Sequence, residues 1–468
     1  MTTDRKNFGS KLGVILASAG SAVGLGNIWR FPTEVGKNGG AAFILVYLAC
    51  VLLIGVPIMM GEFVIGRHTR ANTATAYQKL APGTWWRVQG GIGVLVAFII
   101  MCYYVVVSGW TLYYAYSSLV GALQYSGDDA GHFSSFFDSF VAHPWLPVLF
   151  AVIFMAVVHL IIIMGVEKGI ERFSKVMMPM LLLIIAVLVV CAFSLPGSSQ
   201  GLHYLFYPDF SKLTASTILS AVGQAFFSLS LAMGCLCTYA SYFRKDTNLV
   251  RTAYSVSIID TIVALMAGVI IFPAVYSVEN PNLEEGAGLV FKSLPYIFSH
   301  AFHSMPVVGY VFSLCFYLLL FLAALTSAIS IHEPVTAYLH EAHRMSRKKA
   351  AMWVSVVCMA LGVFCSLSFG LLGNVKLFGL TIFDCFDAFP SKILMPLGGI
   401  IISLFTGWYL DKKLVHDELT NDGTIRFRLF PFIIFLLRWV IPVAIGLVFV
   451  NQFFDLTKIV DLFAGNQW

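Results

Sequence analysis

One carboxylate and two runs of small residues offer the most informative chemistry in this sequence. Asp260 lies inside the apolar stretch at 248–277. A charge at the centre of a bilayer costs roughly 2.5 to 3.5 kcal/mol, so Asp260 indicates a functional group; the alternative is a protonated acid making a helix contact. Glycine and serine also interrupt apolar segments at 19–27 and 227–234. Interrupted backbone at membrane depth must be buried in protein or line a cavity.

Two enzyme signatures find no support in the sequence. HExxH does not occur, and the glycines of the first run do not match GxGxxG and follow no strand. The nine cysteines lie within or at the ends of apolar segments, and the close pair Cys235 and Cys237 has the wrong spacing for a CxxC site. We therefore expect no enzyme, and cysteines that act as small hydrophobic residues.

The composition places these features in a membrane. Of the 468 residues, 59% are hydrophobic and 11% are charged, whereas soluble proteins carry about 25% charged residues. Long apolar runs recur along the whole chain, each able to cross about 30 Å of hydrocarbon. This pattern argues against a soluble enzyme, a disordered chain, a coiled coil and a nucleic-acid-binding protein. It predicts one all-α integral membrane domain over 1–468.

Charged and Gly/Pro-rich breaks divide the chain into about eleven predicted spans. They lie near 11–37, 41–66, 88–122, 146–164, 175–195, 214–242, 248–277, 305–340, 348–370, 378–410 and 429–453. With a cytoplasmic N-terminus, 21 of the 29 Lys and Arg residues fall in inside connections and 6 outside, with Lys392 and Arg438 within spans. This bias predicts an N-terminus inside and a C-terminus outside, so the net charge of +5 is largely a topology signal.

The two interrupted spans occupy matching places, because each is the first span of a five-span half. The halves are 11–195 and 214–413, followed by an eleventh helix at 427–455. Close helix packing through small residues would explain either run alone. Two interruptions in corresponding positions instead indicate a midplane binding site in an inverted-repeat transporter.

Three segments carry a resemblance to a known family. Residues 20–32 (GSAVGLGNIWRFP) with 38–43 (NGGAAF) closely resemble the first-helix signature of the neurotransmitter:sodium symporter family. Residues 223–231 (GQAFFSLSL) with 239–242 (YASY) resemble its sixth helix, and 325–329 (LTSAI) its eighth. The match covers nearly the whole chain and points to the prokaryotic amino-acid branch. It implies the inverted five-plus-five fold with discontinuous helices 1 and 6, although many members have a twelfth helix.

The resemblance implies two sodium sites built from oxygen ligands, which hard cations prefer. The first would use the Ala22 carbonyl, Asn27, Ser228, Asp260 and the substrate carboxylate. The second would use the Gly20, Val23 and Ala323 carbonyls with the Thr326 and Ser327 hydroxyls. Without the family, such hydroxyls in membrane helices indicate packing or bonds to their own backbone. Asp260 could supply the negative charge that chloride-requiring relatives borrow from the anion, and Ala264 offers no anion-binding hydroxyl, so we expect chloride independence.

The resemblance also suggests the substrate class. Monoamine-carrying relatives place an aspartate at the position of Gly24, so a glycine there implies a substrate with its own carboxylate, an amino acid. The implied substrate-binding residues are Ala22, Gly24, Gly26, Ile100, Tyr104, Phe227, Ser228, Ser230, Met233, Ser327 and Ile331. Ile100, Phe227, Met233 and Ile331 would form an apolar side-chain pocket, and methionine is adaptable. We therefore expect hydrophobic substrates, including aromatic ones.

Two gates are implied for alternating access. Arg30 and Asp387 resemble the outer ion pair, with Tyr104 and Phe227 as an aromatic lid beneath it. Arg5 and Glu341, supported by Tyr242, resemble the cytoplasmic pair. Exposed pairs contribute only about 0 to 1 kcal/mol, which suits gates that open. Glu62 is expected to be structural, whereas Lys392 and Asp384 receive no role from the sequence.

The sequence thus predicts a sodium-coupled symporter that imports hydrophobic or aromatic L-amino acids across a cell membrane. A proton-coupled transporter, in which Asp260 titrates, and a transport-inactive amino-acid sensor remain as alternatives. The expected partners are an amino acid, sodium ions and the bilayer, with no nucleic acid. The oligomeric state stays open, and a monomer is compatible with the sequence. No Asn-x-Ser/Thr sequon occurs, which fits a prokaryotic protein.

Overall fold

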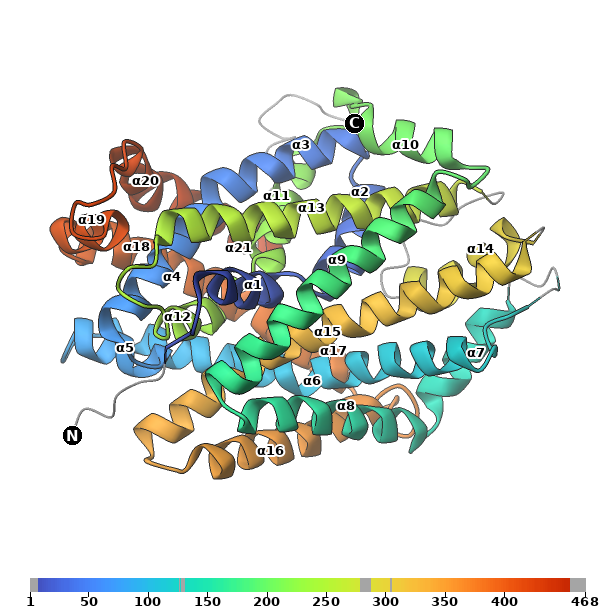
Figure 1. The fold of residues 1–468 in the computed structure, drawn as a ribbon, viewed down its shortest axis with the longest axis horizontal. Helices are drawn as coiled ribbons and strands as arrows, with labels where there is room; N and C mark the ends of the chain where they lie inside the picture. The colour runs from blue at the N-terminus through green and yellow to red at the C-terminus, as the bar shows by residue number, and fades with distance from the viewer. Residues whose placement is uncertain (1–6, 126, 128–130, 278–287, 304, 455–468) are drawn as a thin grey trace.

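The structure is a computed structural model that describes residues 7–125, 127, 131–277, 288–303 and 305–454. Within these residues the chain is helical, apart from one isolated bridge between Leu377 and Leu380. Many of the long helices run roughly along the long axis of the molecule (Figure 1). Nine helices among the described residues are long and apolar enough to cross a membrane: Ala41–Thr69, Arg87–Leu119, Leu146–Ile163, Val166–Ala192, Leu249–Val275, Pro306–Ala342, Arg347–Leu367, Ile382–Tyr409 and Phe430–Asn451.

Five of these spans are single α-helices, and four contain π-helical turns. The single helices are α6 (Arg87–Leu119), α8 (Leu146–Ile163), α13 (Leu249–Val275), α15 (Pro306–Ala342) and α16 (Arg347–Leu367). The composite spans are α3 (Ala41–Cys50), η2 (Val51–Gly55) and α4 (Val56–Thr69); η3 (Val166–Glu171) and α9 (Arg172–Ala192); α17 (Ile382–Ala388), η6 (Phe389–Leu394), α18 (Met395–Leu404) and η7 (Phe405–Tyr409); and α20 (Phe430–Phe435), η8 (Leu436–Val440) and α21 (Ile441–Phe454).

Two further segments are broken, at the places where the small residues occur. The first comprises α1 (Lys11–Ala22), η1 (Gly26–Arg30) and α2 (Phe31–Lys37), and its halves are bent by 52°. The second comprises α11 (Ala215–Ser228) and α12 (Cys235–Ala240), each too short to cross a bilayer alone. The first broken segment brings the candidate spans among the described residues to ten, against about eleven predicted; the predicted sixth span corresponds to α11 and α12, which do not qualify as one by length and hydropathy.

The fifth span begins nine residues before the predicted start. It starts at Val166, whereas the charges between 167 and 175 had placed the start at 175. Those residues continue the helix because Lys175 pairs with Glu171 one turn earlier, with Nζ to Oε1 at 2.6 Å.

Short helices outside the spans were not predicted from hydropathy. They are α5 (Thr73–Leu80), α7 (His132–Ala142), α10 (Ser198–Phe206), η4 (Phe210–Lys212), η5 (Leu289–Ser293), α14 (Leu294–Ala301) and α19 (Lys412–Thr420).

The broken first helix lies at the centre of the packing. α1 contacts α9, α13 and α15, while η1 contacts α13 and α11; Figure 1 shows α1 in the middle of the bundle. We call the end that carries Arg30 the outer end and the end that carries Arg67 the inner end, following the sidedness predicted from the charges.

Candidate functional site

The break in the first helix exposes backbone carbonyls to side chains of other helices. α1 ends at Ala22, and Val23 is extended, with ψ of 112°. The Val23 carbonyl accepts a hydrogen bond from Ser327 Oγ at 3.1 Å and a longer one from Thr326 Oγ1 at 3.5 Å. The Ser21 carbonyl accepts one from Ser230 Oγ at 2.9 Å. Carbonyls that a continuous helix would use internally are thus turned toward the sixth and eighth predicted spans.

The break in α11–α12 adopts an unusual backbone. Ser230, Ala232 and Gly234 all have positive φ, at 53°, 62° and 71°. For residues other than glycine this conformation costs on the order of 1 to 3 kcal/mol and is kept only where the surroundings enforce it. Here Ser230 is buried, and its hydroxyl holds the first helix at the Ser21 carbonyl. The two breaks therefore support one another.

Asp260 lies in a buried polar cluster beside the first break. Asn27 Nδ2 donates to Asp260 Oδ1 at 2.7 Å, and Ser228 Oγ donates to Oδ2 at 2.7 Å. Tyr47, which the sequence analysis missed, donates to Oδ2 at 3.5 Å. All of these partners are neutral, and Asp260 forms no ion pair with any described residue. A charged carboxylate buried in this way costs several kcal/mol, which a bound cation would offset.

The residues predicted for a second sodium site also converge. Thr326 Oγ1 lies 3.0 Å from the Ala323 carbonyl as well as 3.5 Å from that of Val23. A Cβ on Gly20 would meet Thr326 Cβ at 3.4 Å. The donor set is entirely carbonyl and hydroxyl oxygen, which fits a hard monovalent cation.

The predicted contacts for the substrate backbone lie beside these oxygens. A Cβ on Gly24 would collide with Ser327 Oγ and lie 3.4 Å from the Tyr104 hydroxyl, while one on Gly26 would lie 3.0 Å from the Phe227 ring. The buried Tyr104 hydroxyl has no hydrogen-bond partner among the described residues. A polar group that is left unmatched in this way marks a place where a ligand can supply the missing bond.

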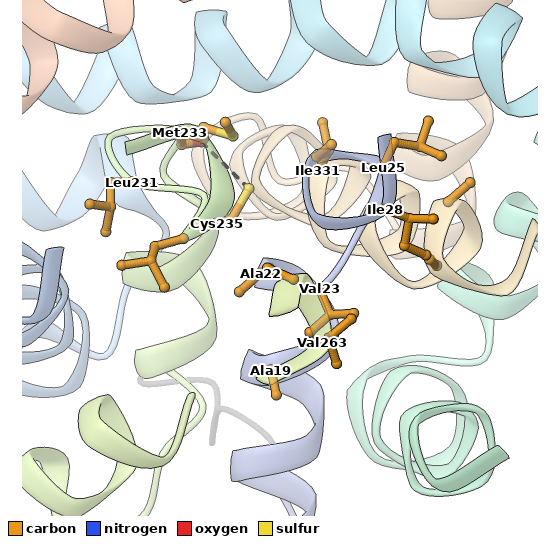
Figure 2. Packing of buried hydrophobic residues seen from close by; sticks show 14 of the residues in the cluster. Ala19, Ala22, Val23, Leu25, Ile28, Leu231, Met233, Cys235, Val263 and Ile331 are labelled. Atoms are coloured by element: carbon orange, nitrogen blue, oxygen red, sulfur yellow. Dashed lines mark hydrogen bonds between the residues drawn. The ribbon is translucent and has the colours of Figure 1, made fainter. Parts of the chain in front are cut away.

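The predicted side-chain pocket is apolar. Ile100, Met233 and Ile331 are 2%, 3% and 4% exposed. In Figure 2, Met233, Ile331 and Ala22 come from three elements that meet at the two breaks.

A cavity of about 470 Å³ opens above these residues toward the outer end. Its lining includes the predicted lid residues Tyr104 and Phe227 and both predicted gate residues, Arg30 and Asp387. The Arg30 guanidinium stacks over the Phe227 ring at 4.5 Å. Arg30 and Asp387 are brought to one cavity, but neither forms an ion pair with a described residue.

The inner end contains a buried ion pair that the sequence analysis did not name. Arg347 donates to Glu333 through two nitrogens at 2.9 and 2.6 Å, and Glu333 is fully buried. Tyr242 also donates to Glu333 Oε1, at 2.7 Å. Glu341 accepts bonds from the Asn72 backbone and side chain at 2.9 and 2.8 Å. Arg5, the predicted partner of Glu341, lies outside the described residues.

The chain before α1 is also held at the inner end. Gly9 N and Ser10 Oγ donate to Glu171 at 2.6 and 3.0 Å, and Phe8 N donates to the Tyr242 carbonyl at 3.0 Å. Phe8 is 1% exposed. The segment before α1 is therefore fixed by contacts with Glu171 and Tyr242 at the inner end.

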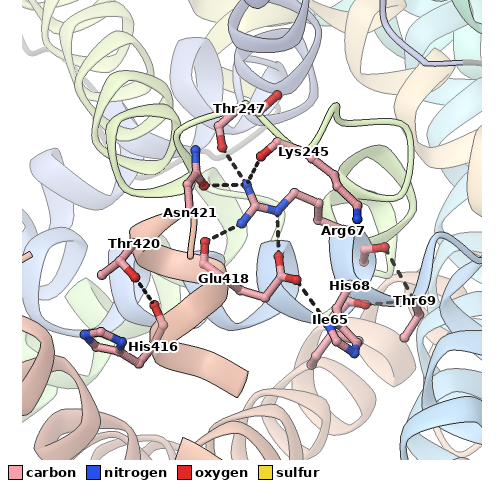
Figure 3. A network of polar contacts seen from close by, with 11 residues as sticks. Ile65, Arg67, His68, Thr69, Lys245, Thr247, His416, Glu418, Thr420 and Asn421 are labelled. Atoms are coloured by element: carbon pink, nitrogen blue, oxygen red, sulfur yellow. Dashed lines mark hydrogen bonds and ion pairs between the residues drawn. The ribbon is translucent and has the colours of Figure 1, made fainter. Parts of the chain in front are cut away.

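A second network ties connections at the inner end together (Figure 3). Arg67 Nε pairs with Glu418 Oε2 at 2.6 Å, and Arg67 Nη1 donates to the Thr247 carbonyl and to Asn421 Oδ1. His68 Nδ1 lies 3.0 Å from Glu418 Oε1. Burial alone would raise the pKa of Glu418, but its contacts with His68 and Arg67 outweigh burial and lower the pKa below its ordinary value.

The structure also gives positions to Asp384 and Lys392, which had no predicted role, and to Glu62, which was predicted to be structural. Asp384 forms a capping box with Thr381 at the start of α17, so it has a local structural role. Lys392 is exposed and lines the outer cavity. Glu62 is 1% exposed and lies near Ala232 in the second break, with one oxygen unpartnered among the described residues.

Gln224 and Glu333 are further polar residues that the sequence analysis missed. Gln224 Nε2 donates to the Gly26 carbonyl at 3.1 Å. Both residues lie within predicted apolar spans, and the reasoning applied to Asp260 would have found Glu333.

Comparisons with known proteins show the family of the chain. The family model described as the sodium:neurotransmitter symporter family matches residues 5–133 and 146–462. The chain belongs to this family. It is 39% identical over 446 residues to an uncharacterized sodium-dependent transporter of Bacillus subtilis, covering 95% of this chain and 97% of the relative. An uncharacterized sodium-dependent transporter of Methanocaldococcus jannaschii is 35% identical, over 90% of this chain and 86% of the relative.

Among solved structures, the chain is similar to MhsT in complex with L-phenylalanine. The TM-score is 0.87 and the identity 42%, over 96% of this chain and 100% of MhsT. The predicted fold class is thereby confirmed: an all-helical membrane protein with the leucine-transporter fold. As a symporter-family member, the protein is a sodium-dependent, multi-pass membrane transporter and not an enzyme.

Proposed function

We propose that the protein is a symporter that couples sodium entry to the import of hydrophobic and aromatic L-amino acids by alternating access. The observation that carries this proposal is the environment of Asp260. A fully buried carboxylate has only neutral partners among the described residues and lies beside two broken helices. Such a site attracts a cation from water and holds it next to the region where an amino-acid carboxylate would lie.

Two sodium ions are proposed, one on each side of the first break. Asp260, Asn27, Ser228 and the Ala22 carbonyl would hold the first, together with the substrate carboxylate. Thr326, Ser327 and the Gly20, Val23 and Ala323 carbonyls would hold the second. Each charge that crosses the membrane supplies about 2.3 kcal/mol per 100 mV. At 100 mV, two ions therefore supply roughly 4.6 kcal/mol. This energy is enough to accumulate a neutral substrate over a thousandfold.

The shape and polarity of the pocket support an amino acid with an apolar side chain. Ser327 fills the space where a side chain at residue 24 would project, so the substrate has to bring the carboxylate. The unmatched Tyr104 hydroxyl is placed to donate to that carboxylate. Ile100, Met233 and Ile331 offer only apolar contacts to the rest of the molecule. That MhsT, 42% identical, has been solved with L-phenylalanine supports the same substrate class.

Asp260 also supports chloride independence. A fixed carboxylate beside the first sodium site supplies the negative charge that a bound anion would otherwise provide. We propose that the N-terminus is cytoplasmic and the C-terminus extracellular, as the bias of Lys and Arg predicts. The cavity above Phe227 would then face outward, and the Glu333–Arg347 pair would close the cytoplasmic side.

The deciding experiment is uptake into liposomes that contain the purified protein. Labelled leucine, tryptophan and tyrosine would be supplied under an inward sodium gradient, with potassium and chloride-free solutions as controls. We expect accumulation that needs sodium and survives the removal of chloride.

Asp260→Asn keeps the size of the side chain and removes its charge. We expect it to weaken sodium binding at least about 30-fold, because loss of one member of a buried charge interaction costs about 2 kcal/mol or more. Tyr104→Phe is the matched test of the substrate site and should weaken substrate binding about tenfold or more, since a bond to a charged group contributes about 1.5 to 3 kcal/mol.

The same preparation separates the rival functions. Uptake that follows a pH gradient and ignores sodium would overturn sodium coupling and favour titration of Asp260. Saturable binding without accumulation would overturn transport and favour a sensor.

A further inference from the structure

An apolar groove of about 540 Å³ lies between α6 and α16, away from the cavity described above. Gly91, Leu95 and Phe98 line it from α6, and Trp353 and Val357 line it from α16. These helices contact each other, and Figure 1 shows α16 along the lower edge of the molecule with α6 above it. Leu95 and Trp353 are 43% and 57% exposed. In a membrane, such a groove faces lipid.

Each of these two helices carries a cation one turn before a residue that lines this groove. Arg87 is the first residue of α6 and lies one turn before Gly91; Lys349 lies one turn before Trp353 in the first turns of α16. Residues four apart share a helix face. Both cations are exposed, and neither forms an ion pair with a described residue.

We propose that this groove binds one anionic phospholipid of the inner leaflet. An acyl chain would lie along the apolar walls, and the phosphate would lie between Arg87 and Lys349. Basic sites between membrane helices bind anionic headgroups through such charge complementarity. Long basic side chains reach the interface while their stems cover apolar surface, and the exposed Trp353 suits the same boundary.

The groove is connected to the transport site through α15. Val335 and Leu339 of α15 line the groove, and Ile331 of the predicted substrate pocket lies one turn from Val335. A lipid in the groove therefore packs against the helix that carries Ile331 and Ser327. Occupancy should stabilise α15 in the arrangement observed here.

The test uses the full-length protein in a neutral detergent. Phosphatidylglycerol and phosphatidylcholine with identical acyl chains would be titrated while native mass spectrometry counts bound lipids. We expect one phosphatidylglycerol to bind at least about tenfold more tightly than phosphatidylcholine. Arg87→Ala and Lys349→Ala should each weaken phosphatidylglycerol about fivefold, since a basic residue near an anionic surface contributes about that factor, and should leave phosphatidylcholine unchanged.

Lys348→Ala is the matched control for charge. Lys348 is also exposed. The residue one turn after it on α16, Met352, does not line the groove. We expect this variant to bind both lipids as the unmodified protein does. Equal losses of phosphatidylglycerol affinity in Lys348→Ala and Lys349→Ala would overturn the proposal, because they would indicate that binding depends only on the general surface charge.

Gly91→Leu tests the chain-binding part without disturbing the fold. A Cβ on Gly91 meets nothing within 4 Å, so leucine can enter the groove without a clash and favours the helix. We expect the site to lose both lipids while the thermal unfolding temperature is kept. Unchanged lipid binding in Gly91→Leu would overturn the proposal.

Two further outcomes concern other occupants. Competition by soluble glycerol phosphate as effective as that by phosphatidylglycerol would overturn the role of the acyl chain. A protein dimer that persists without phospholipid and is lost in Gly91→Leu would overturn lipid binding and place a second copy in the groove.

Discussion

Charged residues occur at both ends of the predicted pathway, but those at one end line a cavity and those at the other are buried in protein. At the outer end, Arg30 and Asp387 face a cavity of about 470 Å³ and are not paired with each other. At the inner end, Glu333 and Arg347 meet at 2.6 Å, with side chains that are 0% and 19% exposed. The charges at the outer end thus line a cavity, whereas the pair at the inner end is largely buried in protein.

The difference between the two ends shows that oppositely charged residues can form either a weak or a strong contact, depending on their burial. A pair that keeps its water contributes about 0 to 1 kcal/mol and is easily separated. A buried pair is costly to break one partner at a time, because the remaining charge stays in a poor solvent. The hydroxyl of Tyr242 shares Glu333 with Arg347, so opening the inner end requires water to replace several bonds together.

The largest expected effect follows from removing one member of the inner pair. Arg347→Ala leaves Glu333 buried without its cation, and we expect the free energy of unfolding to fall by about 3 to 5 kcal/mol. Thermal unfolding in detergent measures this change. The double variant Glu333→Gln with Arg347→Met should recover most of the loss, since no unpaired charge remains. Arg344→Ala, an exposed neighbour, serves as the control; equal destabilisation by it would contradict the special role of the pair.

A smaller effect is expected at the Arg67–Glu418 network. Glu418→Gln should lower the free energy of unfolding by about 1 to 3 kcal/mol at neutral pH, the cost of weakening hydrogen bonds to a charged group.

The same network predicts a pH dependence with a definite sign. The pKa of Glu418 is lower in the folded protein than its ordinary value, so its contribution is complete above the unfolded pKa, about 4.3. It is lost as the pH falls through the folded pKa. Unfolding temperatures from pH 7 down to pH 3 should show an acid-induced loss that is smaller in Glu418→Gln. Parallel curves for the two proteins would count against this interpretation.

The smallest effect on stability is expected at the outer end. Arg30→Gln and Asp387→Asn should each change the free energy of unfolding by no more than about 0.5 kcal/mol, because both side chains already face the cavity. Both variants should nevertheless reduce uptake, since Arg30 covers Phe227 and Asp387 lines the same cavity. If the free energy of unfolding fell by about 3 kcal/mol in either variant, the proposed difference in stability contribution between the two ends would be wrong.

The sequence by itself determined the features that depend on neighbouring residues in the chain. Hydropathy located the spans, with the fifth the main exception, because transfer from water into lipid depends on local composition. The small residues at 19–27 and 227–234 located the two breaks, because glycine and serine weaken a helix wherever they occur. Asp260 was found because an ionisable residue is unusual in the middle of a membrane-spanning segment.

Only the tertiary structure decided which distant groups meet. Tyr47 reaches Asp260 across 213 residues, and Tyr242 reaches Glu333 across 91; nothing local at either position indicates its partner. The shared cavity of Arg30 and Asp387, which form no ion pair with each other, was equally invisible in the sequence. These relations depend on how helices pack and on how much water remains between them, and both are set by the whole bundle at once.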